Sequence, residues 1–581
     1  MDKATSILNG KFIFKALPDG GIDRTKAICI YCKSVFSFHR STSSLKYHLA
    51  AKHTADAESP PPPSNLKQTT LGGVARRPLD VSTTRQLSTE LAKWVSTSCR
   101  PISIVEDEGL RNIIRIASGD YTYALPCRTT TTTKMHDLYE GERAKVAEAV
   151  AQTSTVALTG DYWTSLGNHS YLGVTAHYFD SKWVLKSHVL TVMKTEERHL
   201  ANTVAEHFMK VAQEWDIENK VSTLTTDSAR NMIAASRELP FEHMPCAAHL
   251  LQRAITVTLN NSPFDGVLAK CRKVVGHFKH SPPNAAGLEQ QQVAHGLPKD
   301  ALTQDVSTRW NSTLEMVRSV LKNKEPLKNT LALHTTKVTM PTPAEMDKLQ
   351  KLEAVLEPCR YITELLGGEK YVSSSVVLPA LSHLYNAMQV SEDDPAYLAK
   401  FKEALMNDLD QRKDKTNMEW LKVATALDPR FKDLKSLNKA DRAGVWRSIT
   451  ALLRGISPAQ PEQPTTSEPP KKRLALMFAE SSTDDEEDTI ETCLARYRAE
   501  PTIDLEACPL EWWSNHEGAH SLMARLARKY LATPATSVPC ERLFSLSGHI
   551  VQKKRASLLA ENVNRLVCLS DWLSPESPKK T

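Results

Sequence analysis

The chain has 581 residues, which is longer than one hydrophobic core usually supports, so we expect three or four folding units. Its 41% hydrophobic and 24% charged residues are typical of a soluble globular protein, and its formal net charge of +6 is mildly basic. No stretch approaches the roughly 18 apolar residues of a membrane helix, and the N-terminus lacks the apolar run of a signal peptide. Eleven cysteines fit a reducing compartment with one metal site better than a disulfide framework. We therefore expect an intracellular protein with no membrane partner.

Two cysteines and two histidines mark the first unit, which we place at residues 1–55. They form one C-x-x-C pair and one pair of histidines with four residues between them: Cys29, Cys32, His48 and His53. Two thiolates and two imidazoles complete the tetrahedral shell of a structural zinc ion. Because so small a unit can barely bury a core, metal binding would supply most of its folding energy. We predict a zinc site at these four residues.

The residues around the zinc ligands indicate a short helix that is suited to DNA. Helix-start side chains occupy residues 41–44, and Leu45 and Leu49 fall on one helical side with the histidines. With the upstream aromatic residues Phe12 and Phe14, the unit resembles the BED zinc finger, whose helix reads DNA, although Phe stands where that family usually has Trp. If the helix enters a major groove, the positions able to reach bases or phosphates are Ser41, Ser44, Lys46 and Tyr47.

Composition shifts mark two linkers. Residues 56–75 include four consecutive prolines and are predicted to form an extended spacer. Residues 456–490 combine Pro, Gln, Ser and Thr with a basic trio and an acidic block, which is too little apolar material for a core, so we predict a disordered linker. Its Pro-Lys-Lys-Arg run at 470–473 is compatible with a nuclear localisation signal and equally with solvated charge.

Hydrophobic periodicity predicts a sheet with covering helices in the next part of the chain. Residues 76–152 form a helical N-terminal region, and residues 153–262 follow the order β, β, β, α, β, α, β, α. The first three strands are predicted to be antiparallel, with a hairpin turn at residues 180–182. Val204, Phe208 and Val211 fall at helical spacing, which indicates a helix that covers the sheet.

Two aspartates, Asp161 and Asp227, follow the apolar residues of the first and fourth predicted strands. In an RNase H-like fold these strands lie side by side, so the carboxylates meet. Two close carboxylates need a compensating cation, and a pair of Mg²⁺ ions supplies it while clamping the oxygens of a phosphoryl transfer. We predict Glu541 as the third acidic ligand. Taken singly, the aspartates are more often turn or cap residues, and Glu541 beside Arg542 is more often a surface ion pair.

The blocks around these acids resemble those of the hAT transposases and of their host-adopted relatives, the zinc-finger BED proteins. The blocks are D-x-W-T-S at residues 161–165, T-D at 226–227 and C-E-R-x-F-S at 540–545, where Cys540 stands in place of the family's usual Ser. The resemblance covers most of residues 70–572 with gaps. It implies a DDE triad of Asp161, Asp227 and Glu541 that uses Mg²⁺ or Mn²⁺. We predict no other cofactor site and no small-molecule substrate.

Two further blocks match this family. Cys246 and His249 form its C-x-x-H element near the active site, for which we favour a DNA-proximal or structural role over a metal site, since no second pair is nearby. Residues 307–312 match its R-W block, in which Trp310 can stack on an unpaired base while Arg309 meets phosphate. From the residues alone, a half-buried Trp310 with a paired Arg309 is equally compatible.

The remaining residues complete a multidomain α+β/α architecture. Residues 263–455 show helical spacing and fit the family's α-helical insertion, which interrupts the RNase H-like core. Residues 491–573 resemble the hAT C-terminal dimerisation region that completes this core. Its apolar residues exceed what two short helices can bury alone: Leu543, Phe544, Leu546, Leu559, Val563, Leu566 and Val567. We therefore predict a homodimer or larger assembly.

Three functions are compatible with these features. The first is a zinc-dependent, sequence-specific DNA-binding transposase with a metal-dependent DDE site for strand cleavage and transfer. The second is a domesticated, non-catalytic BED-finger transcription regulator that dimerises through its C-terminal region. The third, suggested only by relatives, is a SUMO-ligase-like interaction protein, for which we find no catalytic motif. The three acidic residues favour the first function, and DNA binding predicts residence in the nucleus.

Overall fold

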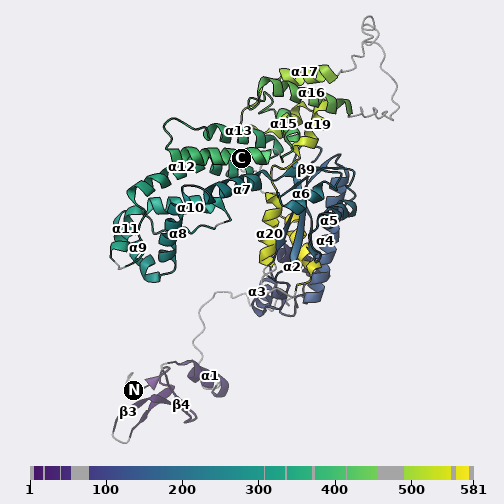
Figure 1. Ribbon diagram of the computed structural model, residues 1–581. Helices are drawn as coiled ribbons and strands as arrows, with labels where there is room; N and C mark the ends of the chain where they lie inside the picture. Colours follow the sequence, from purple (N-terminus) through teal and green to yellow (C-terminus); the bar gives the residue numbers. More distant parts are fainter. Residues whose placement is uncertain are drawn as a thin grey trace, which may run out of the picture. The chain divides into compact units, whose positions relative to one another are not determined.

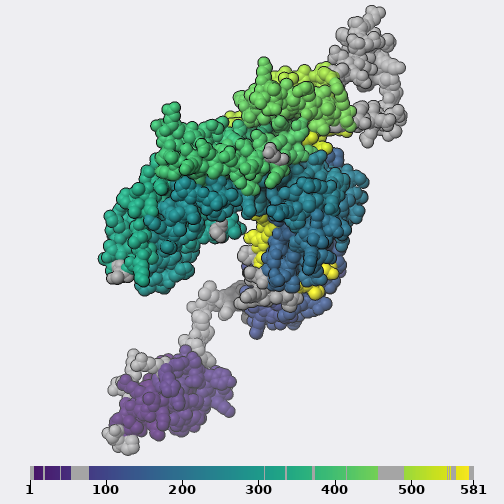
Figure 2. All heavy atoms as spheres, viewed as in Figure 1, coloured from purple at the N-terminus to yellow at the C-terminus, as the bar shows by residue number. Residues whose placement is uncertain are grey.

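The computed structural model describes residues 6–17, 20–39, 41–53, 78–165, 167–306, 308–333, 336–368, 373–413, 415–455, 490–550 and 558–574. The chain divides into two compact units, Met1–Arg77 and Pro78–Thr581 (Figures 1 and 2). The predicted linkers lie outside the described residues, as does the basic run at 470–473, except that Ile490 already begins a helix. Within the described ranges, the model contains no helix that is long and apolar enough to cross a membrane.

The first unit is a small antiparallel sheet with one helix. The strands pair in the order β1-β2-β3-β4. The elements are β1 (Ser6–Ile7), β2 (Phe12–Ala16), β3 (Ile22–Cys29), β4 (Val35–Ser37) and α1 (Ser43–Lys52). Helix α1 begins after Thr42, within the predicted start, and its Leu45 is buried with Phe12 while Leu49 packs on the same cluster. So few apolar side chains make a minimal core, which suits a unit that metal binding stabilises.

The second unit contains a five-stranded sheet of order β7-β6-β5-β8-β9. Its elements follow the predicted order: β5 (Val156–Thr164), β6 (Ser170–Phe179), β7 (Leu185–Thr195), α5 (Ala201–Glu214), β8 (Val221–Thr226), α6 (Arg230–Ser236), β9 (Glu242–Pro245) and α7 (Ala247–Asn260). Strands β5, β6 and β7 are antiparallel neighbours, and β8 and β9 run parallel to β5. The first and fourth strands are therefore adjacent, as the RNase H-like prediction requires.

Helices cover both faces of this sheet. Besides α5, the helices of this part of the chain are α2 (Val81–Thr97), η2 (Ile102–Glu106), α3 (Glu108–Ser118), α4 (Arg128–Ala151), α20 (Val538–Ile550) and α21 (Ala560–Trp572), of which α20 and α21 contact strands of the sheet and α3 contacts η2. On one face Leu158 packs with Phe208 of α5, and Gly160 is required because a Cβ there would lie 2.2 Å from the Phe208 ring. On the other face α20 packs on β5 and β6, α21 packs on β7, and α2 packs on α21. The sheet is thus a buried central layer.

The apolar residues of the C-terminal helices are largely buried within the same chain. Val563 and Val567 are fully buried with Ala92 of α2, and Leu543 and Leu566 belong to the same cluster. Phe544 packs against this cluster, Leu559 is 68% exposed, and the Leu546 side chain lies outside the described atoms. The two C-terminal helices therefore do not bury these residues alone, as predicted, and the additional partners include α2 of the N-terminal region.

The predicted insertion is helical. Its elements are α8 (Asp265–Lys279), α9 (Pro282–Ala294), α10 (Trp310–Lys322), α11 (Lys324–Ala332), α12 (Pro343–Leu366), η3 (Ser374–Val376), α13 (Val377–Ala387), α14 (Ala396–Lys413), α15 (Met418–Leu427) and α16 (Lys439–Gly455). After the second linker, α17 (Ile490–Ala499), α18 (Pro509–His516) and α19 (Ser521–Leu531) join the same hydrophobic cluster. The two sides of the linker therefore share one core.

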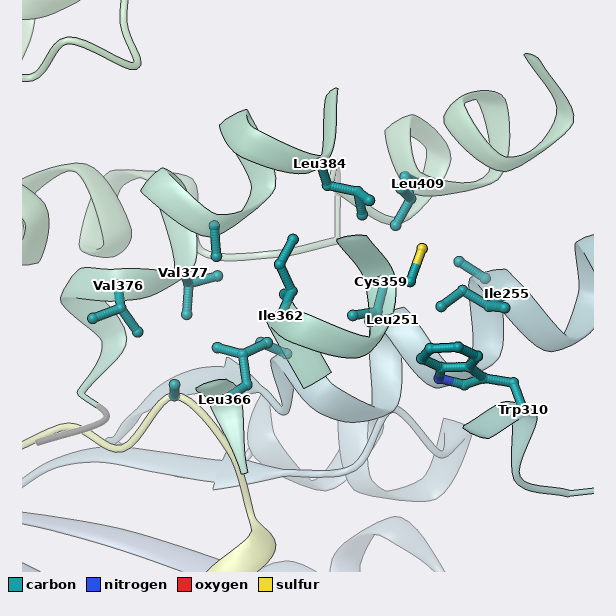
Figure 3. Packing of buried hydrophobic residues seen from close by; sticks show 14 of the residues in the cluster. Leu251, Ile255, Trp310, Cys359, Ile362, Leu366, Val376, Val377, Leu384 and Leu409 are labelled. Atoms are coloured by element: carbon teal, nitrogen blue, oxygen red, sulfur yellow. The ribbon is translucent and has the colours of Figure 1, made fainter. Parts of the chain in front are cut away.

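Trp310 lies inside this helical core. It is the first residue of α10, is 1% exposed, and packs among residues that include Ile255 of α7 and Cys359 of α12 (Figure 3). A ring buried on this scale has no face to offer a nucleotide base. The prediction that Trp310 stacks on an unpaired base is therefore wrong for this structure, and burial exceeds even the half-buried alternative.

Replacing Trp310 tests this packing role. Trp310→Ala should lower the free energy of unfolding of the second unit by roughly 3–5 kcal/mol, because it empties a large buried volume. Trp310→Phe should cost less, since the indole Nε1 has no hydrogen-bond partner among the described residues. Urea titration followed by circular dichroism measures both values. Tyr361→Ala, at a residue that is 57% exposed, is the matched control, and an equal loss there would contradict the assignment.

Candidate functional site

The four predicted zinc ligands lie together in the first unit. Cys29 ends β3, Cys32 follows in the turn before β4, and His48 and His53 come from α1 and its C-terminal cap. Their ligand atoms all lie within 4.8 Å of one another. The Cys32 sulfur is 3.2 Å from His48 Nε2. Two sulfurs and two nitrogens converging on one point are the donor set of a tetrahedral zinc site.

The surroundings of these ligands also fit a metal. The Ser34 hydroxyl, 3.2 Å from the Cys32 sulfur, and the Ser34 backbone amide lower the pKa of Cys32 to about 5, which favours the thiolate that binds zinc. His53 Nε2 is buried and has no hydrogen-bond partner among the described residues. Phe36 lies against His48, with ring centroids 4.6 Å apart. Aromatic packing therefore fixes the His48 imidazole, and the His53 nitrogen is available to a cation.

The helix that carries the histidines presents polar side chains to solvent. The positions predicted to contact DNA are all exposed: Ser41, Ser44, Lys46 and Tyr47. Tyr47 is 76% exposed although it is aromatic. An exposed aromatic side chain beside a lysine is the combination expected at a surface that contacts bases and phosphates.

Asp161 and Asp227 occupy neighbouring strands on one face of the sheet. In the parallel pair, Thr159 lies opposite Thr225, so two residues further along Asp161 lies beside Asp227. Asp227 directly follows β8, as predicted, but Asp161 lies within β5 and pairs with Gly173 of β6. The difference arises because β5 keeps its antiparallel partner β6 after its parallel pairing with β8 has stopped. The side-by-side placement follows from the adjacent strands.

Glu541 reaches this face on the first turn of α20. The preceding segment is fixed to the sheet by side chains: Thr533 Oγ1 lies 3.1 Å from Thr223 Oγ1, and the Cys540 sulfur lies 3.1 Å from Thr159 Oγ1. A Cβ at Gly173 would lie 3.1 Å from the Phe544 ring, so this glycine allows α20 to approach closely. The segment therefore positions the Glu541 carboxylate, from near the C-terminus, at the face of the sheet that carries Asp161.

The three acids act on one another electrostatically. Burial, followed by the negative charge of Asp227 and a smaller contribution from Glu541, raises the pKa of Asp161 to about 7. The carboxylate oxygens accept only short-range backbone bonds in the described contacts, 2.8 Å from Tyr162 to Asp161 and 3.1 Å from Ala229 to Asp227. The acids therefore combine excess negative charge with carboxylate oxygens that can coordinate a metal, and oxygen ligands of this kind suit Mg²⁺ or Mn²⁺.

His249, the histidine of the C-x-x-H element, enters the acidic centre from α7. Its Nε2 lies 3.7 Å from a Glu541 carboxylate oxygen. The neighbouring Cys246 side chain, and then the charges of Glu541 and Asp161, raise the pKa of His249 to about 9. The raised pKa favours the imidazolium form of a side chain that lies beside the acids. Sequence reasoning placed His249 near the active site but predicted no contact between it and the acids.

Sequence reasoning missed the threonines that position the acids. Thr159 and Thr175 share a buried hydrogen bond, and His177 Nε2 lies 2.9 Å from Thr175 Oγ1. The signal was present, because Thr159 and Asp161, like Thr225 and Asp227, are two residues apart and so share one face of a strand. Polar residues at this spacing in otherwise apolar strands indicate a face that contacts another polar segment.

Arg309 keeps its predicted exposure. It precedes α10 and is exposed, although the neighbouring Trp310 is buried. The Gln252 side-chain amide of α7 donates to the backbone oxygen of Thr308, at 2.6 Å, which ties the Arg309 segment to the helix that carries His249. The segment before α10 is therefore joined to α7, and phosphate contact by Arg309 stays a prediction.

Removing zinc tests the predicted metal site of the first unit. A strong chelator, or Cys29→Ser, should unfold the first unit and leave the second intact, because the finger has only a minimal core of its own. Metal analysis should give about one zinc per chain before treatment, and limited proteolysis should then cut within residues 6–53. Cys127→Ser, an exposed cysteine of the second unit, is the matched control. Protection of residues 6–53 after complete zinc removal would contradict this assignment.

Comparison with protein families gives four matches along the chain. Residues 14–54 match the BED zinc finger, and residues 159–254 match the ZBED1 RNase-like domain. Residues 244–355 match the ZBED1 RNase-like helical domain, and residues 493–573 match the hAT family C-terminal dimerisation region. Their order agrees with the finger, sheet, helical insertion and C-terminal helices seen in the structure.

Individual relatives share this organisation at low identity. A putative AC transposase of Zea mays is 25% identical over 82% of this chain and 63% of its own length, so the chain spans less than two thirds of that relative. A putative transcriptional regulator, tpeD, of Talaromyces stipitatus is 23% identical over 95% of this chain and 70% of its own. The zinc finger BED domain-containing protein RICESLEEPER 2 of Oryza sativa subsp. japonica is 21% identical over 84% and 75%. These matches give the chain a BED zinc finger, ZBED1 RNase-like domains and a hAT dimerisation region, and its relatives include proteins named as transposases and as BED zinc finger proteins.

Proposed function

We propose that this protein binds DNA through its zinc finger and, as a transposase, cleaves and rejoins DNA strands at the acidic centre. The observation that carries the proposal is that Asp227 and Glu541, from distant segments of the chain, lie near enough to Asp161 to act on its carboxyl group. The mutual effect of these acids on the pKa of Asp161 supports a shared cation site. The relative named as a transposase supports the same reading. Such a protein would act in the nucleus and as a homo-oligomer.

Each group has a separate task in this proposal. Asp161, Asp227 and Glu541 would hold divalent cations, which would supply charge that stabilises the oxygens of a phosphoryl transfer. His249 holds Glu541 in place through its ion pair and offsets negative charge while no cation is bound. In the finger, Lys46 and Tyr47 contact DNA from the exposed side of α1. The zinc finger would provide DNA sequence specificity, and the acidic centre would cleave and join the strands.

A second function, a non-catalytic DNA-binding regulator, has one observation in its favour. His249 lies 3.7 Å from Glu541 and its raised pKa favours the cationic form, which would provide part of the positive charge that a metal would otherwise supply. The acids are then compatible with a stable fold without a cation. The relative named as a transcriptional regulator supports this alternative. The two functions differ only in what the acidic centre does.

Neutralising one acid separates the two functions. With Mn²⁺ or Mg²⁺, the purified protein should nick a plasmid that carries the genomic segments flanking its gene, and Asp161→Asn should reduce nicking to background because a cation ligand is lost. DNA affinity, measured by fluorescence anisotropy, should stay within about twofold since the finger is unchanged. Glu206→Gln, an exposed carboxylate of α5, is the matched control. Equal nicking by Asp161→Asn would refute the catalytic site, and no nicking by the unaltered protein would favour the regulator.

Cation binding should depend on pH. The pKa of Asp161 is raised to about 7, so below that pH the carboxyl group is mostly protonated and a cation must displace the proton. Mn²⁺ affinity, measured by electron paramagnetic resonance, should therefore rise about tenfold from pH 5 to pH 6 and level off above about pH 8. Asp161→Asn should bind weakly and show little of this rise. A pH-independent affinity in the unaltered protein would show that Asp161 is not a ligand.

A further inference from the structure

A strip of polar side chains runs along α7 from the acidic centre. The opposite side of this helix carries Leu251 and Ile255, which are buried in the helical core. On the helical wheel His249 and Arg253 lie together on the outer side, one turn apart. His249 Nε2 lies 3.7 Å from a Glu541 carboxylate oxygen, and Arg253 is exposed. Four residues of helix advance about 6 Å, so Arg253 begins one turn away from the residue that contacts the acids.

A second arginine lies beside this strip. The Gln252 side-chain amide donates to the Thr308 backbone oxygen at 2.6 Å. This bond joins the residue before Arg253 to the residue before Arg309. Arg309 is exposed as well. The two arginines are therefore carried by adjoining segments, one on α7 and one directly before α10.

The segment that carries Arg309 is held in place by the protein. The Ser312 hydroxyl donates to the Arg309 backbone oxygen at 2.6 Å, and the Val306 amide donates to the same hydroxyl at 2.7 Å. Trp310, the next residue, is 1% exposed and lies near Ile255 of α7 in the core (Figure 3). A ligand site built on fixed segments loses less conformational entropy when the ligand binds.

Neither arginine is neutralised within the chain. Among the residues that the structure describes, the guanidinium groups of Arg253 and Arg309 have no ion pair and no hydrogen bond. Asp305, an acid of the segment before α10, is 4% exposed and is bound instead by Arg272, whose Nε lies 2.8 Å from it. By contrast, Arg318 of α10 is paired with acids of α12. Two positive charges on adjoining segments repel each other, and an anion that contacts both would offset this repulsion.

A backbone phosphate of DNA is the anion that fits this position. Guanidinium groups bind phosphate oxygens through paired hydrogen bonds and stay charged at any physiological pH. Successive phosphates of one strand are separated by a distance similar to the helical turn between His249 and Arg253. A strand with one phosphate at the acidic centre would therefore present the next phosphate to Arg253.

We infer that Arg253, with Arg309 beside it, binds the backbone phosphate next to the one at the acidic centre and so positions the DNA strand along α7. The inference rests on the proposed cleavage at this centre, and it names the residues that hold the substrate there. Arg253 would contact a neighbouring phosphate and not the reacting atoms, so it is a positioning residue. Its replacement should weaken DNA binding more than it slows cleavage of DNA that is already bound.

Fluorescence anisotropy with the full-length, zinc-loaded chain tests this contact. The probe is a duplex from the genomic segments that flank the gene, and Ca²⁺ replaces Mn²⁺ so that the duplex is not cut. Arg253→Gln should weaken binding about tenfold, because one charged hydrogen-bonding contact is lost. The slope of log affinity against log salt concentration should fall by about one. Arg253→Lys should keep that slope, since it keeps the charge. Arg447→Gln, at an exposed arginine of α16, is the matched control and should bind like the unaltered protein.

Neutral methylphosphonate linkages identify the phosphate. A single such linkage beside the mapped nick should weaken binding by the unaltered protein and by Arg447→Gln about tenfold. The same linkage should change binding by Arg253→Gln very little, because the arginine that contacts this phosphate is already absent. Equal losses in all three proteins at every position would refute the contact.

Nicking assays with Mn²⁺ separate this inference from the proposed function. Arg253→Gln should raise the DNA concentration for half-maximal rate about tenfold and keep the maximal rate within about twofold. If the unaltered protein nicks DNA and Arg253→Gln keeps the same affinity and salt slope, the phosphate contact is refuted while cleavage stands. If the unaltered protein does not nick, the cleavage function fails. The salt slope of Arg253→Gln then decides the phosphate contact independently: a lower slope supports it and an unchanged slope refutes it.

Discussion

Hydrogen bonds between threonines of the sheet and the segment before α20 hold the candidate site together. Thr223 and Thr225 of β8 bond the side chain of Thr533 and the backbone of Pro534, and Thr159 of β5 meets Cys540. Buried polar groups must find partners, so this face of the sheet accepts a polar segment and rejects a purely apolar one. The position of Glu541 depends on these bonds, as does the closure of the core between segments that are more than 300 residues apart in sequence.

The acidic centre and the helical core meet at α7. Its first turn carries His249 toward Glu541, while Leu251 and Ile255 of the same helix pack into the insertion (Figure 3). A rigid element that serves both a charged centre and a hydrophobic core transmits a shift in one to the other. The insertion is therefore more than a spacer between Asp227 and Glu541. By packing on α7, it also fixes His249, the histidine that lies beside the acids.

Local patterns allowed much of this to be predicted. The zinc ligands followed from their spacing, and the adjacency of β5 and β8 followed from strand order. Burial of Trp310 depends on α12, whose Cys359 lies far along the chain, and burial of Val563 depends on Ala92 of α2. Short-range periodicity contains no information about such partners, so neither contact was predicted. The partner of His249 was missed for the same reason.

The shared core of the second unit has a consequence for its covalent continuity. Residues 78–455 and 490–574 are joined by the buried cluster that includes Trp513 and by the threonine contacts with Thr533. None of these contacts uses the residues between Gly455 and Ile490. A single cleavage of the backbone in that interval would therefore leave two fragments that stay associated as a noncovalent complex. Asp161, Asp227 and Glu541 would keep their positions in that complex.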